Sequence, residues 1–198
     1  PSKKHPKMDR FVFGIRQVIN IIDLERSKEQ LDAILPSIEE MAAMGKTILF
    51  LGTKRQAQAI VREEAEKIGT PFIVERWLGG LLTNFGHVSN SMKRLTKLKT
   101  EKEQGLWDGR YTKKEQLMFE REIEDFTKLV GGVELMTKLP DALFVVDCKK
   151  EKTAVKEANK LNIPVIAMVD TNVNPDKIAY QIPANDDGVK SIRYVVQQ

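Results

Sequence analysis

Residues 140–175 carry the clearest hydrophobic pattern of the chain. The apolar run 142–146 ends at Asp147, and a second apolar run, 165–169, ends at Asp170. Between the two runs, apolar residues recur at spacings of four and three, which predicts a helix with one buried side. Continuous apolar runs are typical of strands that are covered on both faces. The pattern therefore predicts a strand, a crossover helix and a parallel strand, in a sheet with helices on both faces.

The segments before this unit show the spacing of apolar residues that is typical of strands and then the spacing that is typical of a helix. Residues 11–22 contain alternating and then paired apolar positions, which predicts a short antiparallel strand pair. Ser27 and Gln30 form a capping-box pattern, and a helical period follows as far as Gly45. Because Pro36 lies inside this period and an interior proline costs about 3 kcal/mol, we expect it to kink the helix or to mark a later start.

The remaining elements of the predicted sheet follow in order. Apolar residues predict buried strands at 47–51 and 72–74, and Thr53 with Gln56 repeats the capping-box pattern at the start of the helix between them. After the central unit, a short apolar segment surrounds residues 180–182. A last helix is predicted from Asp187 onward.

Residues 87–130 differ in character from the rest of the chain. Two charge-rich stretches each keep apolar residues at helical spacing, and Gly105 and Gly109 lie between them. This pattern predicts an antiparallel helical hairpin with coiled-coil packing, inserted between the third and fourth strands of the sheet. We therefore expect an α/β domain made of residues 1–86 and 131–198, of which residues 1–16 form a basic arm, and a hairpin at 87–130 that projects from it.

Composition narrows the class of protein. The chain has 198 residues, a formal net charge of +4 and a single cysteine, Cys148. No apolar run reaches the roughly 20 residues that cross a bilayer, and the basic, polar start has no signal-peptide pattern. His5 and His87 lie far apart in the sequence, so neither indicates a metal site. We expect a cytoplasmic protein without a metal or other cofactor and without a membrane partner, and the modest basic charge permits an anionic partner.

Two candidate sites lie at the ends of predicted strands. Gly52, Lys54 and Arg55 follow a strand and open a helix, where backbone N–H groups favour an anion such as a nucleotide phosphate or a nucleic-acid phosphate. A capped helix with exposed basic residues explains the same pattern without any ligand. Asp147 and Asp170 end adjacent strands, where α/β proteins place ligands. One hypothesis is therefore a nucleotide-binding or phosphotransfer domain that uses Gly52, Asp147 and Asp170, although the acidic pair that a magnesium phospho-acceptor site needs after the first strand is absent.

Two further candidate sites, a phosphate-binding loop and a reactive thiol, lack part of the pattern that each would need. Gly45, Lys46 and Thr47 resemble the end of a phosphate-binding loop, but they precede a strand and lack the first glycine of that motif. Cys148 lies beside Lys149, which would lower the thiol pKa if the side chain were exposed, while a buried thiol would be inert. The sequence contains no complete catalytic set, so we expect no enzyme activity. A third hypothesis is a scaffold whose hairpin binds a partner helix.

Basic residues gather in the first sixteen residues and in the first half of the hairpin. The hairpin's cations cluster from Lys93 to Lys102 and around its turn, whereas its acids concentrate in the second helix. A solvated coiled coil explains this distribution, and an arm that contacts phosphates explains the asymmetry better.

Four segments together resemble one protein family over essentially the whole chain. They read, in order, KMDRFVFGIRQVINIIDL, FLGTKRQA, RWLGGLLTNF and PDALFVVDCKKEKTAVKEANKLNIPVIAMVDTNVNP. In this order they are similar to the bacterial or organellar form of the second small-subunit ribosomal protein, the S-two family. A generic α/β domain has no reason to combine RWLGGLLTNF with a helical hairpin directly after it.

The resemblance implies a flavodoxin-like parallel sheet with a protruding coiled-coil hairpin. It implies a structural role in translation, as a ribonucleoprotein component that binds small-subunit ribosomal RNA, contacts neighbouring small-subunit proteins and helps to dock the large first one. It implies no homo-oligomer, and a location on the cytoplasmic ribosome, with an organellar ribosome left open. By the same resemblance, the chain lacks the family's segments before Pro1 and after Gln198.

Carried onto this chain, the resemblance implies a set of RNA contacts that work by phosphate neutralisation and shape recognition. Trp77 is expected mainly in the core, with base stacking as a lesser role. The implied contacts are Lys3, Lys4, Lys7, Arg10, Arg16, Lys54, Arg55, Arg76, Trp77, Asn84, Lys93 and Arg94.

Overall fold

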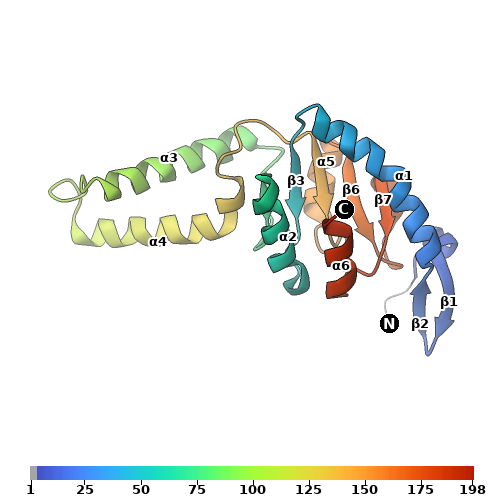
Figure 1. Cartoon of the computed structure of the whole chain (residues 1–198). Coiled ribbons are helices and arrows are strands. Elements are labelled where there is room, and N and C mark those ends of the chain that lie inside the picture. The colour runs from blue at the N-terminus through green and yellow to red at the C-terminus, as the bar shows by residue number, and fades with distance from the viewer. Residues whose placement is uncertain (1–3) are drawn as a thin grey trace.

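The computed structural model describes residues 4–198 and contains a five-stranded parallel sheet (Figure 1). In spatial order the strands are β4 (Phe72–Ile73), β3 (Ile48–Leu51), β5 (Ala142–Val145), β6 (Val165–Val169) and β7 (Tyr180–Pro183). All four pairs of neighbours are parallel. Every residue of β5 and β6 is buried, as continuous apolar runs predict.

Helices cover both faces of this sheet (Figure 1). One face packs against α1 (Leu24–Ala43), α2 (Arg55–Ile68) and α6 (Val189–Val196). The other face packs against α5 (Lys152–Lys160), the connection at 75–84 and the base of the following helix pair. The central strand, crossover helix and strand are β5, α5 and β6, so the predicted fold class is confirmed.

The N-terminal region forms a small structure beside the sheet. A 3₁₀ helix, η1 (Pro6–Phe11), leads into an antiparallel ribbon of β1 (Val12–Arg16) and β2 (Ile19–Ile22). The two-residue turn places Gln17 and Val18 at positive φ angles of 47° and 67°. Met8 and Phe11 are buried in the core of the body, so η1 is packed against the sheet domain.

Two predicted helix starts were wrong, and α1 continues through Pro36. The α1 helix begins at Leu24, because the Asp23 carboxylate accepts hydrogen bonds from the backbone N–H groups of the first turn while the Ser27 hydroxyl donates to the Asp23 carbonyl. The α2 helix has Lys54 at its N-cap and no side-chain cap, because the Thr53 hydroxyl donates to Glu151 instead. In both places the hydroxyl group forms its hydrogen bond outside the predicted capping box.

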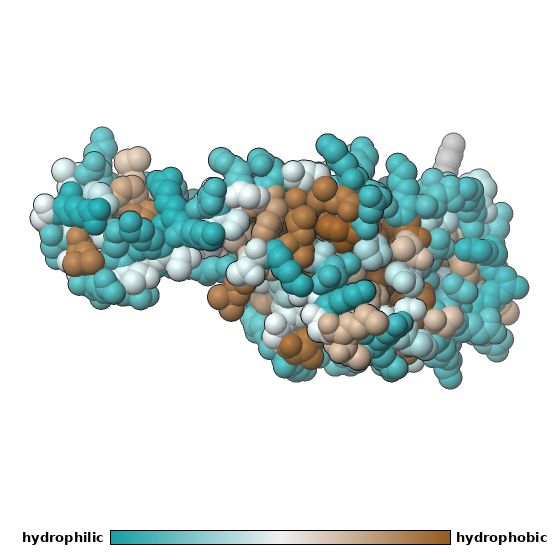
Figure 2. Space-filling view, turned by 90° about the horizontal axis from the view of Figure 1, so that it is seen from above, coloured by the Kyte–Doolittle hydropathy of each residue, from teal (hydrophilic) through white to brown (hydrophobic). Residues whose placement is uncertain are grey.

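Two long helices, α3 (Phe85–Glu103) and α4 (Lys113–Val130), lie side by side and extend away from the sheet (Figure 1). Near their turn, Trp107, Tyr111 and Phe119 pack edge to face with centroid distances of 5.1–6.4 Å. The surface of this helix pair is mostly hydrophilic, whereas hydrophobic side chains gather on the body (Figure 2). None of the described helices is both long and apolar enough to span a bilayer.

A short 3₁₀ turn, η2 (Gly131–Val133), joins α4 to the body, and another, η3 (Pro175–Lys177), precedes β7. A Cβ atom at Gly132 would lie 2.2 Å from the Phe72 carbonyl oxygen, so only glycine fits where η2 passes the edge strand β4. This close approach fixes the base of the helix pair against the sheet.

Candidate nucleic-acid interface

A cluster of charges lies at the carboxyl edge of the sheet, around the side chain of Lys54. Its Nζ atom is 3.0 Å from Asp147, 2.6 Å from Asp186 and 2.8 Å from Asp187. Burial disfavours the ammonium charge, but hydrogen bonds to the three carboxylates outweigh burial and raise the pKa of Lys54. Burial, together with the neighbouring Asp147, raises the pKa of Asp186 to about 6 despite its bond to Lys54. The Lys54 ammonium, which was predicted to contact RNA, therefore already has three carboxylate partners within the protein.

The strand-end aspartates also serve the local backbone. One Asp147 oxygen accepts hydrogen bonds from the backbone N–H groups of Lys149 and Lys150, at 2.9 and 3.0 Å, and Asp170 accepts one from Thr171 at 2.7 Å. At Gly52, a Cβ atom would lie 2.8 Å from Val61, so close packing between β3 and α2 explains the glycine. These contacts account for Gly52, Asp147 and Asp170 without a nucleotide, and the phosphotransfer hypothesis loses its support.

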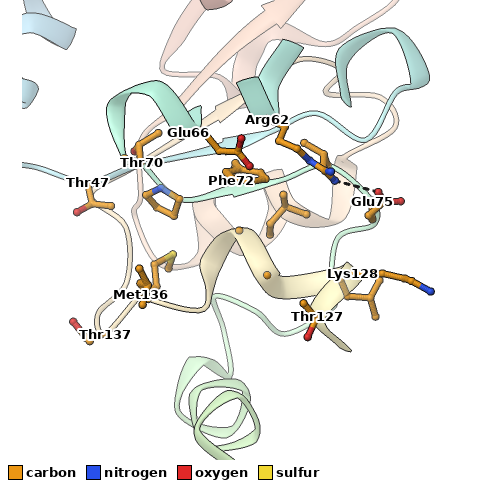
Figure 3. A pocket seen from close by; sticks show the side chains of 18 of the residues that line it. Thr47, Arg62, Glu66, Thr70, Phe72, Glu75, Thr127, Lys128, Met136 and Thr137 are labelled. Carbon is orange, nitrogen blue, oxygen red and sulfur yellow. Dashed lines mark hydrogen bonds and ion pairs between the residues drawn. The ribbon is translucent and has the colours of Figure 1, made fainter. Parts of the chain in front are cut away.

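A groove of about 920 Å³ opens elsewhere, between α2, the edge strand β4 and the base of α4 (Figure 3). Arg62 and Glu75, which both line it, form an ion pair at 3.5 Å. Thr47 and Thr70 line its far part, toward the amino ends of the strands. None of the residues that the phosphotransfer hypothesis needs lines this groove, so it gives that hypothesis no second location.

Cys148 is buried at the end of β5, and burial raises the pKa of its thiol to about 12. Because the thiolate is the reactive form, we expect the folded protein to react with a thiol reagent such as dithionitrobenzoate at least tenfold more slowly than the urea-unfolded chain at pH 8. Absorbance at the dye's maximum measures the rate. Equal rates in the two states would contradict a buried thiol.

The connection at 75–84 is held in place by one carboxylate. One oxygen of Glu157 on α5 accepts hydrogen bonds from the Trp77 indole at 3.1 Å and the Gly80 N–H at 2.8 Å; the other accepts from Leu82 and Thr83. Burial opposes ionisation here, but these donors outweigh it and lower the pKa of Glu157. Sequence reasoning missed this residue, although an acid on the buried side of a predicted helix is a signal for such a role.

The hydrogen bonds to Glu157 determine which side chains of the connection are buried and which are exposed. Trp77 is buried and its indole N–H donates to Glu157, as expected of a residue that lies mainly in the core. Arg76 and Asn84 are exposed on either side of the bound segment. Arg55 is also exposed, at the first turn of α2. Since β3 and β4 are parallel neighbours, Arg55 and Arg76 follow strands that end at the same edge of the sheet.

Most predicted contacts of the basic arm have partners within the protein. Lys3 lies outside the described residues. Lys4 forms an ion pair with Asp9 at 2.7 Å, and Lys7 pairs with Asp176. The Arg10 guanidinium donates to the Gln181 side chain at 3.1 Å. Arg16, at the end of β1, is exposed and forms no ion pair with any described residue.

Two cations of α3 form ion pairs with acids of α4. Arg94 of α3 lies 3.4 Å from Glu122 of α4, and Lys102 lies 2.8 Å from Glu120. Lys93 is exposed and has no ion pair among the described residues. Of the two predicted hairpin contacts, Arg94 therefore has a carboxylate partner on α4, whereas Lys93 has none among the described residues.

Comparison with known proteins identifies the family. A model of the family described as "Ribosomal protein S2" matches residues 1–198. Proteins named small ribosomal subunit protein uS2 from Chlorobaculum parvum and Chlorobium luteolum are each 45% identical over 192 residues, which are 97% of this chain and 76% of the relative. The protein of the same name from Coprothermobacter proteolyticus is 46% identical over 194 residues, 98% of this chain and 72% of the relative.

The chain belongs to the ribosomal protein S2 family. The match agrees with the resemblance seen in the four sequence segments, and the parallel sheet with helices on both faces fits the flavodoxin-like fold that the resemblance implied. The ribosomal protein S2 family is a family of ribosomal proteins and not of enzymes.

Proposed function

We infer that the protein is a structural component of the small ribosomal subunit and that it supports translation without catalysing a reaction. The family match over the whole chain is the single observation that carries this conclusion. The internal contacts of the strand-end residues support it, because Asp147 binds Lys54 and local backbone N–H groups, and Asp170 accepts a hydrogen bond from Thr171.

Within this role, we propose that the protein binds small-subunit ribosomal RNA through exposed cations that lack internal ion pairs. Of the predicted contacts, these are Arg16, Arg55, Arg76 and Lys93, which have no ion pair among the described residues, and Asn84 is a further exposed polar group. Phosphate neutralisation gives such cations affinity, while those already paired inside the fold have less to gain. Lys3, Lys4, Lys7, Arg10, Lys54 and Arg94 stay predictions that the internal contacts weaken or leave open.

The partners and organisation beyond RNA are also part of the proposal. We propose that residues 1–86 and 131–198 act as one α/β domain, that residues 87–130 act as an inserted hairpin, and that neighbouring small-subunit proteins, including the large first one, contact this body. The location proposed is the ribosome in the cytoplasm. The paired charges along α3 and α4 support a rigid hairpin, because each interhelical pair fixes their register.

A titration of ribosomal RNA at several salt concentrations tests RNA binding. We expect log K to fall linearly with log salt, and Arg55→Gln to make that slope shallower by about one, since one phosphate contact is lost. Filter binding measures both quantities. The matched control is Lys46→Gln, an exposed cation at the amino edge of the sheet, which should leave the slope unchanged. A flat salt response of the unaltered protein would contradict the proposal.

A further inference from the structure

The outer face of α5 carries a row of lysines that none of the predicted contacts includes. Lys152, Lys156 and Lys160 recur every fourth residue and are all exposed. At 1.5 Å rise per residue, they extend along about 12 Å of one helix face. Lys149 precedes the row in the turn before α5, and Lys177 lies beyond its end, where the Asn159 side chain donates to the Lys177 carbonyl at 3.1 Å.

These lysines are not neutralised within the fold. Among the described residues, none of Lys152, Lys156 and Lys160 has a carboxylate within ion-pair distance. The two acids of the same segment point inward: Glu151 is buried and accepts a bond from Thr53, and Glu157 is buried against the connection at 75–84. Among the described residues, the charges on the exposed face of α5 are therefore all positive, whereas on α3 Arg94 and Lys102 pair with acids of α4.

The arrangement is unfavourable for the isolated protein. Like charges at a spacing of four residues destabilise a helix by about 0.2–0.5 kcal/mol per pair, and α5 contains two such pairs. Lys152 also occupies the first turn, where the helix dipole disfavours a cation. A polyanion bound along the row would remove both unfavourable effects, because its phosphates would neutralise the lysines of this nine-residue helix.

The helix that carries the row also contacts the connection at 75–84 through its buried side. Glu157 joins α5 directly to the connection at 75–84, which exposes Arg76 and Asn84. We propose that the lysine row of α5 binds the phosphate backbone of small-subunit ribosomal RNA and extends the contact made by the connection. This proposal rests on the proposed ribosomal function and adds to it a binding surface of its own.

Three substitutions that keep helix propensity test the row. We expect the K152Q/K156Q/K160Q variant of the full chain to bind ribosomal RNA with a salt slope shallower by about two to three, as three phosphate contacts are lost. The matched control is K28Q/K113Q/K114Q, which removes the same charge from exposed lysines without ion pairs on α1 and α4. Its slope should change by less than one. Thermal unfolding should show both variants folded, because all six side chains are exposed.

Amine modification gives a second readout that needs no variant. Acetylation of Lys152, Lys156 and Lys160, followed by mass spectrometry, should fall severalfold when the unaltered protein is bound to ribosomal RNA, while Lys113 and Lys114 stay reactive. Equal slopes of the two triple variants, with the row unprotected, would overturn this proposal and leave the proposed function standing. Protection that requires other small-subunit proteins would assign the face to an acidic protein and also overturn it. Absence of salt-dependent binding by the unaltered protein would instead remove the proposed function.

Discussion

Replacing Lys54 with methionine is expected to lower the free energy of unfolding at pH 7 by about 2–4 kcal/mol. Removal of one partner from a buried ion pair costs about 3–5 kcal/mol because a charge is left without compensation, and the partial exposure of the Lys54 side chain, 18%, reduces that figure. Asp186 suffers most, since its side chain is only 5% exposed and lies near Asp147. Urea unfolding followed by circular dichroism measures the loss.

The loss should depend on pH with a definite sign. The pKa of Asp186 is raised to about 6 in the folded protein, above its value in the unfolded chain, so its ionised form is disfavoured by folding. This group therefore contributes stability that is present at low pH and is lost as pH rises through about 6. Once Asp186 is protonated, it no longer needs the ammonium, so the cost of Lys54→Met should shrink between pH 7 and pH 5.

Two further variants separate the ion pairs from simple loss of a side chain. Asp187 is 66% exposed, so Asp187→Asn should change stability by less than about 1 kcal/mol. Combining Lys54→Met with Asp186→Asn should recover part of the loss, because the substitution removes the uncompensated charge. A cost that is equal at pH 5 and pH 7, and is not relieved in the double variant, would show that the cluster does not act electrostatically.

The Lys54 cluster illustrates what sequence could and could not predict. The apolar runs at 142–146 and 165–169 predicted β5 and β6 correctly, because strands buried on both faces leave no place for polar side chains. Lys54 and Asp186 are 132 positions apart, and no local pattern links them. The sequence located Lys54 at a helix start at the sheet edge, but only the fold shows that its charge is already compensated.

The predictions of where α1 and α2 begin were wrong for a related reason. The capping-box patterns of Ser27 with Gln30 and of Thr53 with Gln56 were plausible, yet each hydroxyl found another partner, the Asp23 carbonyl in one case and Glu151 in the other. Short polar side chains have several acceptors within reach, so local spacing alone does not select one. The lysines of α5 were visible in the sequence, but only the inward direction of Glu151 and Glu157 shows that no carboxylate of the described residues pairs with them.

The sequence of the connection at 75–84 has no helical or strand period, so it did not show which residue holds this segment in place. The residue that does so, Glu157, gives the second large expected effect. Glu157→Gln should lower the free energy of unfolding by about 2–4 kcal/mol at pH 7. The amide retains one acceptor oxygen but turns an NH₂ group toward N–H donors, either those of Leu82 and Thr83 or those of Trp77 and Gly80. Urea unfolding measures the loss, and the exposed, unpaired Glu124→Gln on α4 is the matched control, expected within 0.5 kcal/mol of the unaltered protein.

The pH dependence of this effect is opposite to that of Asp186. The pKa of Glu157 is lowered in the folded protein, so its ionised form contributes stability that is present above the unfolded pKa, about 4.3, and is lost as pH falls through the folded value. The unaltered protein and Glu157→Gln should therefore converge in stability as pH falls through the folded pKa of Glu157, which lies below its unfolded value. A difference between them that stays constant from pH 7 to pH 3 would show that packing, and not the charge, carries the effect.

The same substitution links the fold to the proposed interface. If Glu157 positions the connection, Glu157→Gln should weaken binding of ribosomal RNA severalfold at a protein concentration and temperature where the variant is still folded, because Arg76 and Asn84 lose their fixed placement. Its salt slope should change little, since no cation is removed. Arg76→Gln, in contrast, should make the slope shallower by about one without loss of stability. That pairing of results would separate a residue that positions the interface from one that touches phosphate.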